Sequence, residues 1–432
     1  MVRAFRSRNY RLFFAGQIVS LVGTWITMTA TSWLVYRLTG SALLLGTVGF
    51  AGQFPAFLMG PFAGIFVDRW NRHRLLVATQ ILSMLQSFAL AALTFTGHIT
   101  VMHVIVLSAI QGLVNAFDMP ARQAFLVTII DKREDLGNAI ALNSSMVNVA
   151  RLIGPSVAGV IIAAASEGWC FLIDGFSYMA VIAALLAMRI AASAGGTRPG
   201  TRHPLGQLKE GIVYAFGFTP IRSIILLLAL VSLVGIPYGI LMPVFAKTIF
   251  GGGPHTLGLL MTSSGCGALV GALWLAARKS VLGLGRLIPA ASALFGAGLM
   301  VFSLAPTLWI AVPCLVVTGF GFIIQMAASN TLLQTIVDDE KRGRVMSFYM
   351  MAFFGTAPFG SLMAGFLAAR IGAPHTLLLG GACCIAGSAW FARGLPAMRA
   401  AIRPIYVRMG ILEEVASGVG TATELSIPPE RP

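Results

Sequence analysis

The sequence predicts an all-α membrane protein whose twelve transmembrane helices form two bundles of six. Two observations lead to this fold class. Of the 432 residues, 57% are hydrophobic and only 10% are charged, which is too little charge for the surface of a soluble domain. Apolar segments of roughly 20 residues, long enough to cross a bilayer, recur along the chain in two groups of six that are separated by a polar stretch.

The apolar segments set the expected domain boundaries. The first six lie at about residues 12–36, 45–67, 75–96, 100–120, 138–165 and 169–190, and the second six at about 222–246, 256–277, 286–305, 308–329, 345–369 and 374–394. The stretch between the groups contains glycine, proline and basic residues, as in a cytoplasmic linker. We therefore expect an N-terminal bundle over 1–190, a linker over 191–221, a C-terminal bundle over 222–394 and a partly ordered cytoplasmic tail over 395–432.

Each half of the chain repeats features of the other. The tetrapeptide TIID at residues 128–131 follows the fourth apolar segment, and TIVD at residues 335–338 follows the tenth, an offset of 207. A proline also lies in both the fifth segment, as Pro155, and the eleventh, as Pro358. We therefore predict an internal duplication with pseudo-two-fold symmetry. Parallel six-helix repeats are a transporter architecture in which the substrate site lies at their interface.

The basic residues are unevenly distributed, which predicts the orientation of the chain. It has 30 Lys and Arg residues and a formal net charge of +15, but only Arg37, Lys247 and Arg370 fall in loops assigned to the outer side. The positive-inside rule then places both termini in the cytoplasm, in a multi-pass protein of the bacterial inner membrane. Attraction to anionic lipid headgroups accounts for the basic loops, so no nucleic-acid partner is expected.

The cysteines show no spacing typical of a metal site. All five lie in or beside apolar segments, where thiols serve as packing residues. We therefore expect neither a metal nor a cofactor. No catalytic pairing of His with Asp or Ser recurs at helical spacing, which argues against a membrane-embedded enzyme.

Polar side chains recur within three N-terminal segments at spacings of three and four residues, which place each set on one helix face. Lipid cannot satisfy such groups, so each face must contact protein or a water-filled cavity. Interhelical hydrogen bonding is the alternative, above all for the first segment. For the charged fourth and fifth segments we predict a hydrated cavity for a small-molecule substrate. The three sets are Gln17, Ser20, Thr24, Thr27 and Thr31; Ser108, Gln111, Asn115, Asp118 and Arg122; and Ser144, Asn148, Arg151 and Pro155.

Two charged residues of these sets lie at membrane depth. At 1.5 Å per residue, Asp118 lies about 27 Å and Arg151 roughly 21 Å from the outer ends of their helices. A long Arg side chain can span the difference, so an Asp118–Arg151 pair is one expectation. Arg122, one turn from Asp118 on the same helix, is a competing partner. We interpret Asp174, near the outer end of the sixth segment, as an interface or helix-start residue.

The C-terminal half lacks this pattern, because all its acidic residues between 222 and 394 lie in one loop, at positions 338–340. We predict an asymmetric cavity, titratable on one side and apolar on the other, which suits amphipathic cargo. Ordinary helix packing is the alternative for its large apolar residues. Together with Gln17 and Thr24 of the first segment, the candidate cavity residues are Thr318, Gln325, Ser329, Tyr238, Phe322 and Met350.

A glycine, an acidic residue and several basic residues cluster between the second and third segments, in the run GIFVDRWNRHR at residues 64–74. This run resembles the signature loop of the major facilitator superfamily, G-x-x-x-D-R-x-G-R-R/K, with Asn71 in place of the usual Gly and His73 at a usually basic position. The resemblance implies a cytoplasmic gate latched by Asp68 and Arg72, with Asp118 as the acidic partner on the fourth helix. Asp118 is also the best candidate for a proton carrier, and the two roles compete. The motif residues carried over are Gly64, Asp68, Arg69 and Arg72.

The fifth segment contains ARLIGPSVAG at residues 150–159, which resembles the antiporter motif G-x-x-x-G-P-x-x-G-G of the same superfamily. Gly154, Pro155 and Gly159 match, while Ala150 and Ala158 stand where Gly is usual. A Gly-Pro step bends a helix, and in the family that bend is associated with export. In the fourth segment Ser108 replaces the Arg of the R-x-x-Q-G motif that is linked to proton coupling.

The runs NAFDMPARQAF at residues 115–125 and NVARLIGP at residues 148–155 are similar to the transmembrane secretion effector group, which includes the enterobactin-exporter type. The similarity covers about residues 5–395. It implies the major facilitator fold and a monomeric exporter of siderophore-like, drug-like or other amphipathic molecules. We expect alternating access driven by an ion gradient, with a proton as the coupling ion. An uptake symporter and a lysophospholipid translocase on the same fold are the alternatives.

Overall fold

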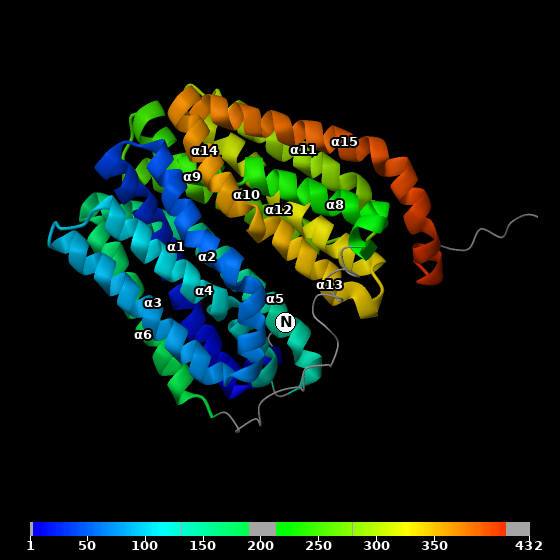
Figure 1. Cartoon of the computed structure of the whole chain (residues 1–432), viewed down its shortest axis with the longest axis horizontal. Coiled ribbons are helices and arrows are strands. Elements are labelled where there is room, and N and C mark those ends of the chain that lie inside the picture. Colours follow the sequence, from blue (N-terminus) through cyan, green and yellow to red (C-terminus); the bar gives the residue numbers. More distant parts are fainter. Residues whose placement is uncertain (1–2, 131, 190–212, 279, 412–432) are drawn as a thin grey trace, which may run out of the picture.

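A computed structural model describes residues 3–130, 132–189, 213–278 and 280–411, apart from the side chains of residues 61, 64, 65, 68, 133 and 340 (Figure 1). These residues form helices and no strand. Twelve of the helices in the described ranges are long and apolar enough to cross a membrane, as the sequence predicted.

The first six spans are uninterrupted helices joined by short turns. Gly40, with a φ of 61°, ends the first helix in the left-handed conformation, and the next residue, Ser41, caps the second by accepting a hydrogen bond from the Leu44 amide. Such a turn reverses the chain within two residues. The helices are α1 (Arg8–Thr39), α2 (Ala42–Arg69), α3 (Arg72–Phe95), α4 (Val101–Ile129), α5 (Leu136–Ala164) and α6 (Glu167–Ala187).

Two of the C-terminal spans are broken by π-helical turns, and in each of these spans one such turn precedes a proline. Pro237 and Pro358 have no amide hydrogen, and their rings would clash with the preceding turn of a regular α-helix, so a wider turn precedes each of them. The seventh span joins α8 (Thr219–Leu230), a π turn (Val231–Gly235), α9 (Tyr238–Val244) and a second π turn (Phe245–Ile249). The eleventh joins α13 (Asp339–Met350), a π turn (Met351–Gly355) and α14 (Ala357–Ile371), and the others are α10 (Pro254–Ala276), α11 (Leu284–Ser303), α12 (Leu308–Ile336) and α15 (Ala373–Arg408).

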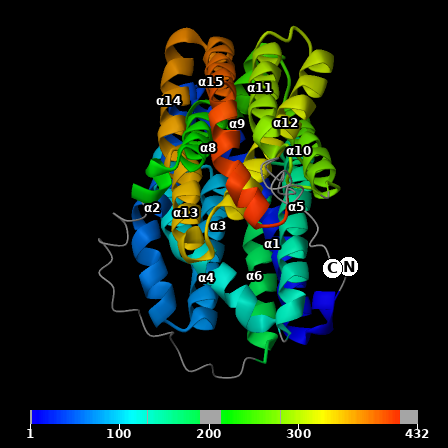
Figure 2. The same cartoon turned by 90° about the vertical axis from the view of Figure 1, so that its right-hand side faces the viewer.

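The helices pack as two bundles that lie side by side (Figure 1). In the N-terminal bundle α1 packs against α5 and α6, and α4 packs against α2 and α3. In the C-terminal bundle α12 packs against α10 and α11, and α11 packs against α15. Two helix pairs, α5 with α10 and α2 with α14, form most of the contact between the bundles. Figure 2 shows the two bundles after a 90° turn.

Both of these inter-bundle contacts are made through glycines. A Cβ atom on Gly46 of α2 would lie 2.6 Å from the Ser361 carbonyl oxygen of α14, and one on Gly258 of α10 would lie 2.7 Å from the Pro155 carbonyl oxygen of α5. Helices that meet at glycines approach to backbone contact, as is common in membranes. The bundles therefore touch closely near the end of the molecule that carries the turn between α1 and α2.

Helix lengths in the two halves follow the repeat seen in the sequence. Both α4 and α12 have 29 residues, and their first residues, Val101 and Leu308, differ by the offset of 207 found for the tetrapeptides. The ends of α5 and α14, Ala164 and Ile371, differ by the same number. This correspondence supports the predicted duplication.

The twelfth membrane span ends at Arg393, and α15 continues without a break through the predicted start of the tail at residue 395 to Arg408. Met398 and Ile402, one turn apart, are buried and pack against the C-terminal bundle, while Arg399 and Arg403 are exposed. An apolar face that covers the bundle thus extends the helix beyond the twelfth span. The rest of the expected tail, residues 412–432, and most of the expected linker, residues 190–212, lie outside the described residues.

Close packing between α10 and α12 gives a stability test. A Cβ atom on Gly319 of α12 would collide with the Ser264 carbonyl oxygen of α10. The Gly319→Ala variant should therefore lose about 1–3 kcal/mol through overpacking and melt at a lower temperature in detergent. Gly137→Ala on α5, where a Cβ meets nothing within 4 Å, is the matched control and should not melt earlier. Equal melting temperatures for the two variants would contradict the packing described here.

Candidate functional site

A cavity of about 480 Å³ lies between the two bundles. Side chains from all six helices of the N-terminal bundle, α1 to α6, line one wall, and side chains from the seventh span, α10, α12 and α14 line the other. Ten of the residues predicted from the sequence line the cavity, namely Thr24, Thr27, Thr31, Ser108, Gln111, Asn115, Arg151, Pro155, Tyr238 and Phe322. The polar faces of α1, α4 and α5 thus meet at the interface between the repeats.

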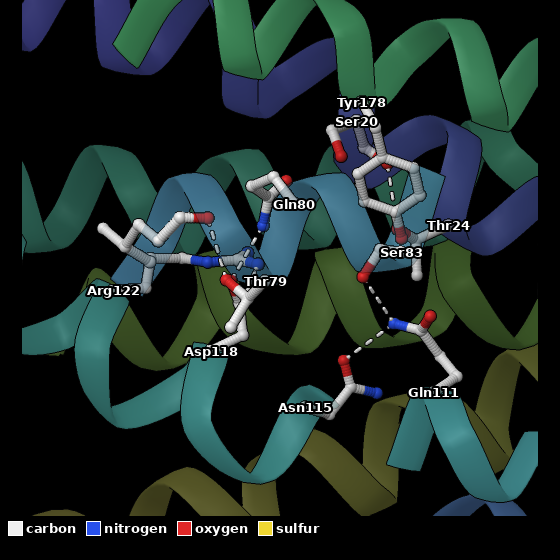
Figure 3. A network of polar contacts seen from close by, with 11 residues as sticks. Ser20, Thr24, Thr79, Gln80, Ser83, Gln111, Asn115, Asp118, Arg122 and Tyr178 are labelled. Carbon is white, nitrogen blue, oxygen red and sulfur yellow. Dashed lines mark hydrogen bonds and ion pairs between the residues drawn. The ribbon is translucent and has the colours of Figure 1, made fainter. Parts of the chain in front are cut away.

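Five other predicted site residues do not line the cavity. Gln17 and Gln325 are buried within their own bundles, with exposed fractions of 2% and 0%. Asn148 donates its side-chain amide to the Ser144 carbonyl oxygen on its own helix, at 2.9 Å. Asp118 and Arg122 lie farther along α4 than Gln111 and Asn115 (Figure 3), and neither contributes to the cavity lining.

Polar contacts join cavity-lining residues of α1 and α4 to side chains of neighbouring helices in the N-terminal bundle (Figure 3). The Gln111 side-chain amide donates to Ser83 of α3 at 3.0 Å and to the Asn115 oxygen at 3.1 Å. On the neighbouring helices, the Tyr178 and Thr24 hydroxyls lie 3.5 Å apart. These contacts satisfy polar groups that lipid would leave without partners, and they hold α1, α3, α4 and α6 in register.

Asp118 pairs with Arg122, and the alternative pair with Arg151 is absent. The Arg122 guanidinium contacts one carboxylate oxygen of Asp118, one turn away on α4. The other oxygen accepts hydrogen bonds from Thr79 at 2.9 Å and from the Gln80 amide at 2.8 Å. The expectation that an Arg side chain spans the depth difference from α5 was wrong, because the partner on the same helix is already in place.

Arg151 is held by aromatic rings instead of a carboxylate. Its guanidinium carbon lies 5.7 Å from the ring centre of Trp25 on α1 and 5.4 Å from that of Phe322 on α12. Such cation–π contacts stabilise a cation without neutralising its charge. Among the described residues no carboxylate lies within ion-pair distance of Arg151, so a positive charge remains available on the cavity wall.

Asp174 is a cavity residue that the sequence interpretation missed. It lies on α6, is only 1% exposed, and contributes to the cavity lining. Its carboxylate accepts hydrogen bonds from Ser87 of α3 at 2.9 Å and from Ser177 at 3.3 Å. The signal available in the sequence was the i, i+3, i+4 set Asp174, Ser177 and Tyr178, which forms a polar face as those of α4 and α5 do.

The opposite wall of the cavity is aromatic and uncharged. Tyr238 and Phe322 line it, and both contact Phe295, with ring centres 6.1 and 5.9 Å away. Both charged residues in the lining, Arg151 and Asp174, come from the N-terminal half. This is the predicted asymmetry, although Thr318, Gln325, Ser329 and Met350 are not part of the lining.

The antiporter-like motif packs α5 against both bundles. Gly154 lies against Trp25 of α1, where a Cβ would collide with the Trp side chain. Gly159 lies against α10, where a Cβ would come within 2.8 Å of the Pro254 carbonyl oxygen. Pro155 lines the cavity between them. The three residues therefore set how closely α5 approaches its neighbours at the cavity.

The candidate gate residues lie at the junction of α2 and α3. Gly64 and Asp68 belong to α2, and the side chain of Asp68 lies outside the described part of the structure. Arg69 is exposed at the end of α2, and Arg72 begins α3.

The two departures from the signature loop have structural roles. Asn71 caps α3 by accepting from the Arg74 amide at 3.1 Å, and the His73 ring hydrogen-bonds the Leu185 carbonyl oxygen at 2.9 Å. Both side chains therefore anchor the start of α3.

The described residues contain no group of three His, Cys, Asp or Glu side chains that could hold a metal ion. All five cysteines are free thiols. The charged groups of the site are thus Arg151 and Asp174 on the cavity wall, together with the Asp118–Arg122 ion pair in the same bundle. Such a site can bind and orient a molecule or hold a proton.

Comparisons with known proteins agree with this geometry. The family model of the transmembrane secretion effectors matches residues 2–408. The chain is 28% identical to the staphyloferrin A transporter of Staphylococcus aureus, over 86% of this chain and 92% of that protein. It is 25% identical to macrolide efflux protein A of Streptococcus pyogenes, over 87% and 94%. It is 26% identical to the multidrug efflux pump Tap of Mycolicibacterium fortuitum, over 82% and 88%.

Solved structures show the same fold at low sequence identity. A bacterial homologue of the human lysosomal transporter Spinster, in an inward-facing and unoccupied conformation, aligns with a TM-score of 0.66 at 15% identity, over 94% of this chain and 98% of that chain. The nucleoside transporter NupG aligns with a TM-score of 0.70 at 12% identity, over 89% and 98%. With twelve candidate spans and a family match along nearly its whole length, the chain belongs to the transmembrane secretion effector family of major facilitator superfamily transporters.

Proposed function

We propose that this protein exports amphipathic small molecules across the bacterial inner membrane by alternating access, in exchange for protons. The observation that carries the proposal is the cavity between the bundles, which has an aromatic wall on one side and the unpaired Arg151 on the other. Such a cavity suits cargo with an apolar body and an anionic or carbonyl group. The relatives are named for staphyloferrin A, for macrolides and for multidrug efflux, which supports export of siderophore-like or drug-like molecules. In this proposal the protein acts as a monomer.

The position of the inter-bundle contacts supports an inward-open state. The glycine contacts of α2 with α14 and of α5 with α10 lie toward the end that carries the turn at Gly40. The distribution of basic residues assigns this end to the outer side. With both termini in the cytoplasm, the cavity is closed outward by these contacts. Rocking of the two bundles would open it to the other side.

The Asp118–Arg122 pair fits a role in the cytoplasmic gate better than proton transfer. An arginine and two neutral donors already occupy both carboxylate oxygens of Asp118. In this proposal the pair fixes the cytoplasmic half of α4 beside the loop between α2 and α3. Asp68 and Arg72 then latch that loop in the state with a closed gate.

Transport direction tests the function itself. In everted membrane vesicles with an acidic interior, we expect the protein to accumulate at least one of three probes, namely erythromycin, ethidium and a citrate-based siderophore. A protonophore should abolish the accumulation. Probe loss from the vesicles under the same gradient would instead indicate an uptake symporter, and movement of headgroup-labelled lysophospholipid alone would indicate a lipid translocase.

Arg151 should select for anionic cargo. The Arg151→Gln variant should lose affinity for a carboxylate-bearing siderophore by about 10- to 100-fold, because a charge-assisted hydrogen bond contributes about 1.5–3 kcal/mol. Binding of erythromycin, which has no carboxylate, should change much less. Fluorescence titration of the purified protein measures both, and an equal loss for the two probes would argue against an anion site.

The contribution of the Asp118–Arg122 ion pair to stability can be measured with two variants. Arg122→Gln leaves the buried Asp118 carboxylate without its partner, which costs about 3–5 kcal/mol for a fully buried pair and less here because Arg122 is partly exposed. Adding Asp118→Asn should restore most of the loss in melting temperature. Additive effects of the two changes would show that the side chains do not interact.

A further inference from the structure

The buried carboxylates of the described helices differ in what neutralises them. There are three, Asp118, Glu167 and Asp174. Asp118 pairs with Arg122, and Glu167 pairs with Arg37 at 2.7 Å. Asp174 has no Lys, Arg or His within 4 Å among the described residues, although it is the most deeply buried of the three. A buried carboxylate without a counter-charge is costly unless a proton or another cation neutralises it.

The hydrogen-bond partners of Asp174 suit both of its protonation states. Ser87 and Ser177 donate hydroxyl groups to it, and a hydroxyl can rotate to accept a hydrogen bond instead. When Asp174 gains a proton, a hydroxyl partner can accept a hydrogen bond from the new O–H group, so the contact is kept. Asp118 differs, because the guanidinium of Arg122 can only donate hydrogen bonds and carries the opposite charge.

Among the described residues Asp174 has no ion-pair partner, so its protonation would break no salt bridge. Packed against α6 are α1, which presents Thr27, and α3, which presents Gln86 and Ser87. On α6 itself Tyr178 is the neighbouring titratable group, and beyond it lie Asp118 and Arg122. Arg151 is the other charged group in the cavity lining.

Packing keeps this carboxylate in place at the cavity. A Cβ on Gly23 of α1 would lie 2.6 Å from both the Asp174 carboxylate and the Ser177 hydroxyl. Only a residue without a side chain leaves α1 close enough to cover Asp174 while leaving space for it. The carboxylate is therefore shielded from lipid, yet it forms part of the wall of the cavity between the bundles.

We propose that Asp174 is the site that carries the coupling proton. In the outward-open state a hydronium ion in the cavity transfers its proton to a carboxylate oxygen of Asp174, forming the O–H bond and leaving water. In the inward-open state the proton returns to water on the cytoplasmic side, and the carboxylate keeps its hydroxyl partners. This inference rests on the proposed proton-coupled export, and it assigns the proton to α6 and not to Asp118 on α4.

Infrared difference spectroscopy of the purified protein tests the site without any cargo. A protonated carboxyl group gives a C=O stretching band, which should titrate with pH in the wild type. The Asp174→Asn variant should lose this band, Asp174→Glu should retain it at a shifted frequency, and the matched Asp118→Asn variant should retain the wild-type band. A band that persists in Asp174→Asn and vanishes in Asp118→Asn would overturn the proposal.

Chemical labelling of the wild-type protein covers the case in which a variant does not fold. Dicyclohexylcarbodiimide modifies protonated carboxyl groups in apolar surroundings, and peptide mass spectrometry locates the product. Modification at Asp174 that decreases as the pH rises, with none at Asp118, is expected. An unmodified Asp174 at every pH would contradict the assignment.

Transport completes the test with a readout that a structural role would not change. With erythromycin as the probe, Asp174→Asn should lose accumulation driven by a pH gradient but keep exchange down a concentration gradient. Retained pH-driven accumulation would overturn the proposal. The infrared and labelling results do not depend on cargo, so they decide the role of Asp174 even if the proposed export is wrong.

Discussion

The structure depends on one constraint, which is that lipid cannot solvate a polar side chain. Most charged and polar groups within the twelve spans therefore have partners in protein or face the cavity. In the N-terminal bundle, hydrogen bonds among amides and hydroxyls join four helices, and the ion pairs Asp118–Arg122 and Glu167–Arg37 neutralise two buried carboxylates. Its buried charges fall into two classes: those matched by an opposite charge, such as Asp118, and those left facing the cavity, such as Arg151 and Asp174. The second class is where solutes and protons can take part.

The two halves share an architecture but not a chemistry. The offset of 207 that relates α4 to α12 places Gln325 at the position of Asp118 and Ser329 at that of Arg122. An amide and a hydroxyl thus occupy the positions of the ion pair, and neither has a hydrogen-bond partner among the described residues. The two copies share their helices, but only the N-terminal copy places charged side chains in the cavity lining. The C-terminal copy contributes the aromatic rings of Tyr238 and Phe322 to the opposite wall.

Most of the fold could be predicted from the sequence, and the site only in part. The number of spans and their bundle assignment follow from hydrophobicity, because each span must bury about 20 apolar residues. Helical spacing correctly placed Gln111, Asn115 and Arg151 at the cavity. It could not show whether Asp118 pairs with Arg122 or with Arg151, because a flexible Arg side chain can reach Asp118 from either position. Asp174 was misjudged because depth along a helix does not reveal which face meets the cavity. Beyond residue 395 the helix continues although Pro396 and Pro404 lie within it, and Met398 and Ile402 of this part pack against the C-terminal bundle.

The setting of Arg151 has a thermodynamic consequence. Trp25 and Arg151 belong to the same bundle, whereas Phe322 belongs to the other. A rigid-body movement that parts the bundles would thus preserve one ring contact and break the other. Because a cation–π contact contributes about 0.5–2 kcal/mol, its loss alone shifts the ratio of two conformations by roughly twofold to thirtyfold. An anion that draws the guanidinium away from Phe322 would weaken the same contact, so cargo of that charge would lower the free energy needed to leave the present state.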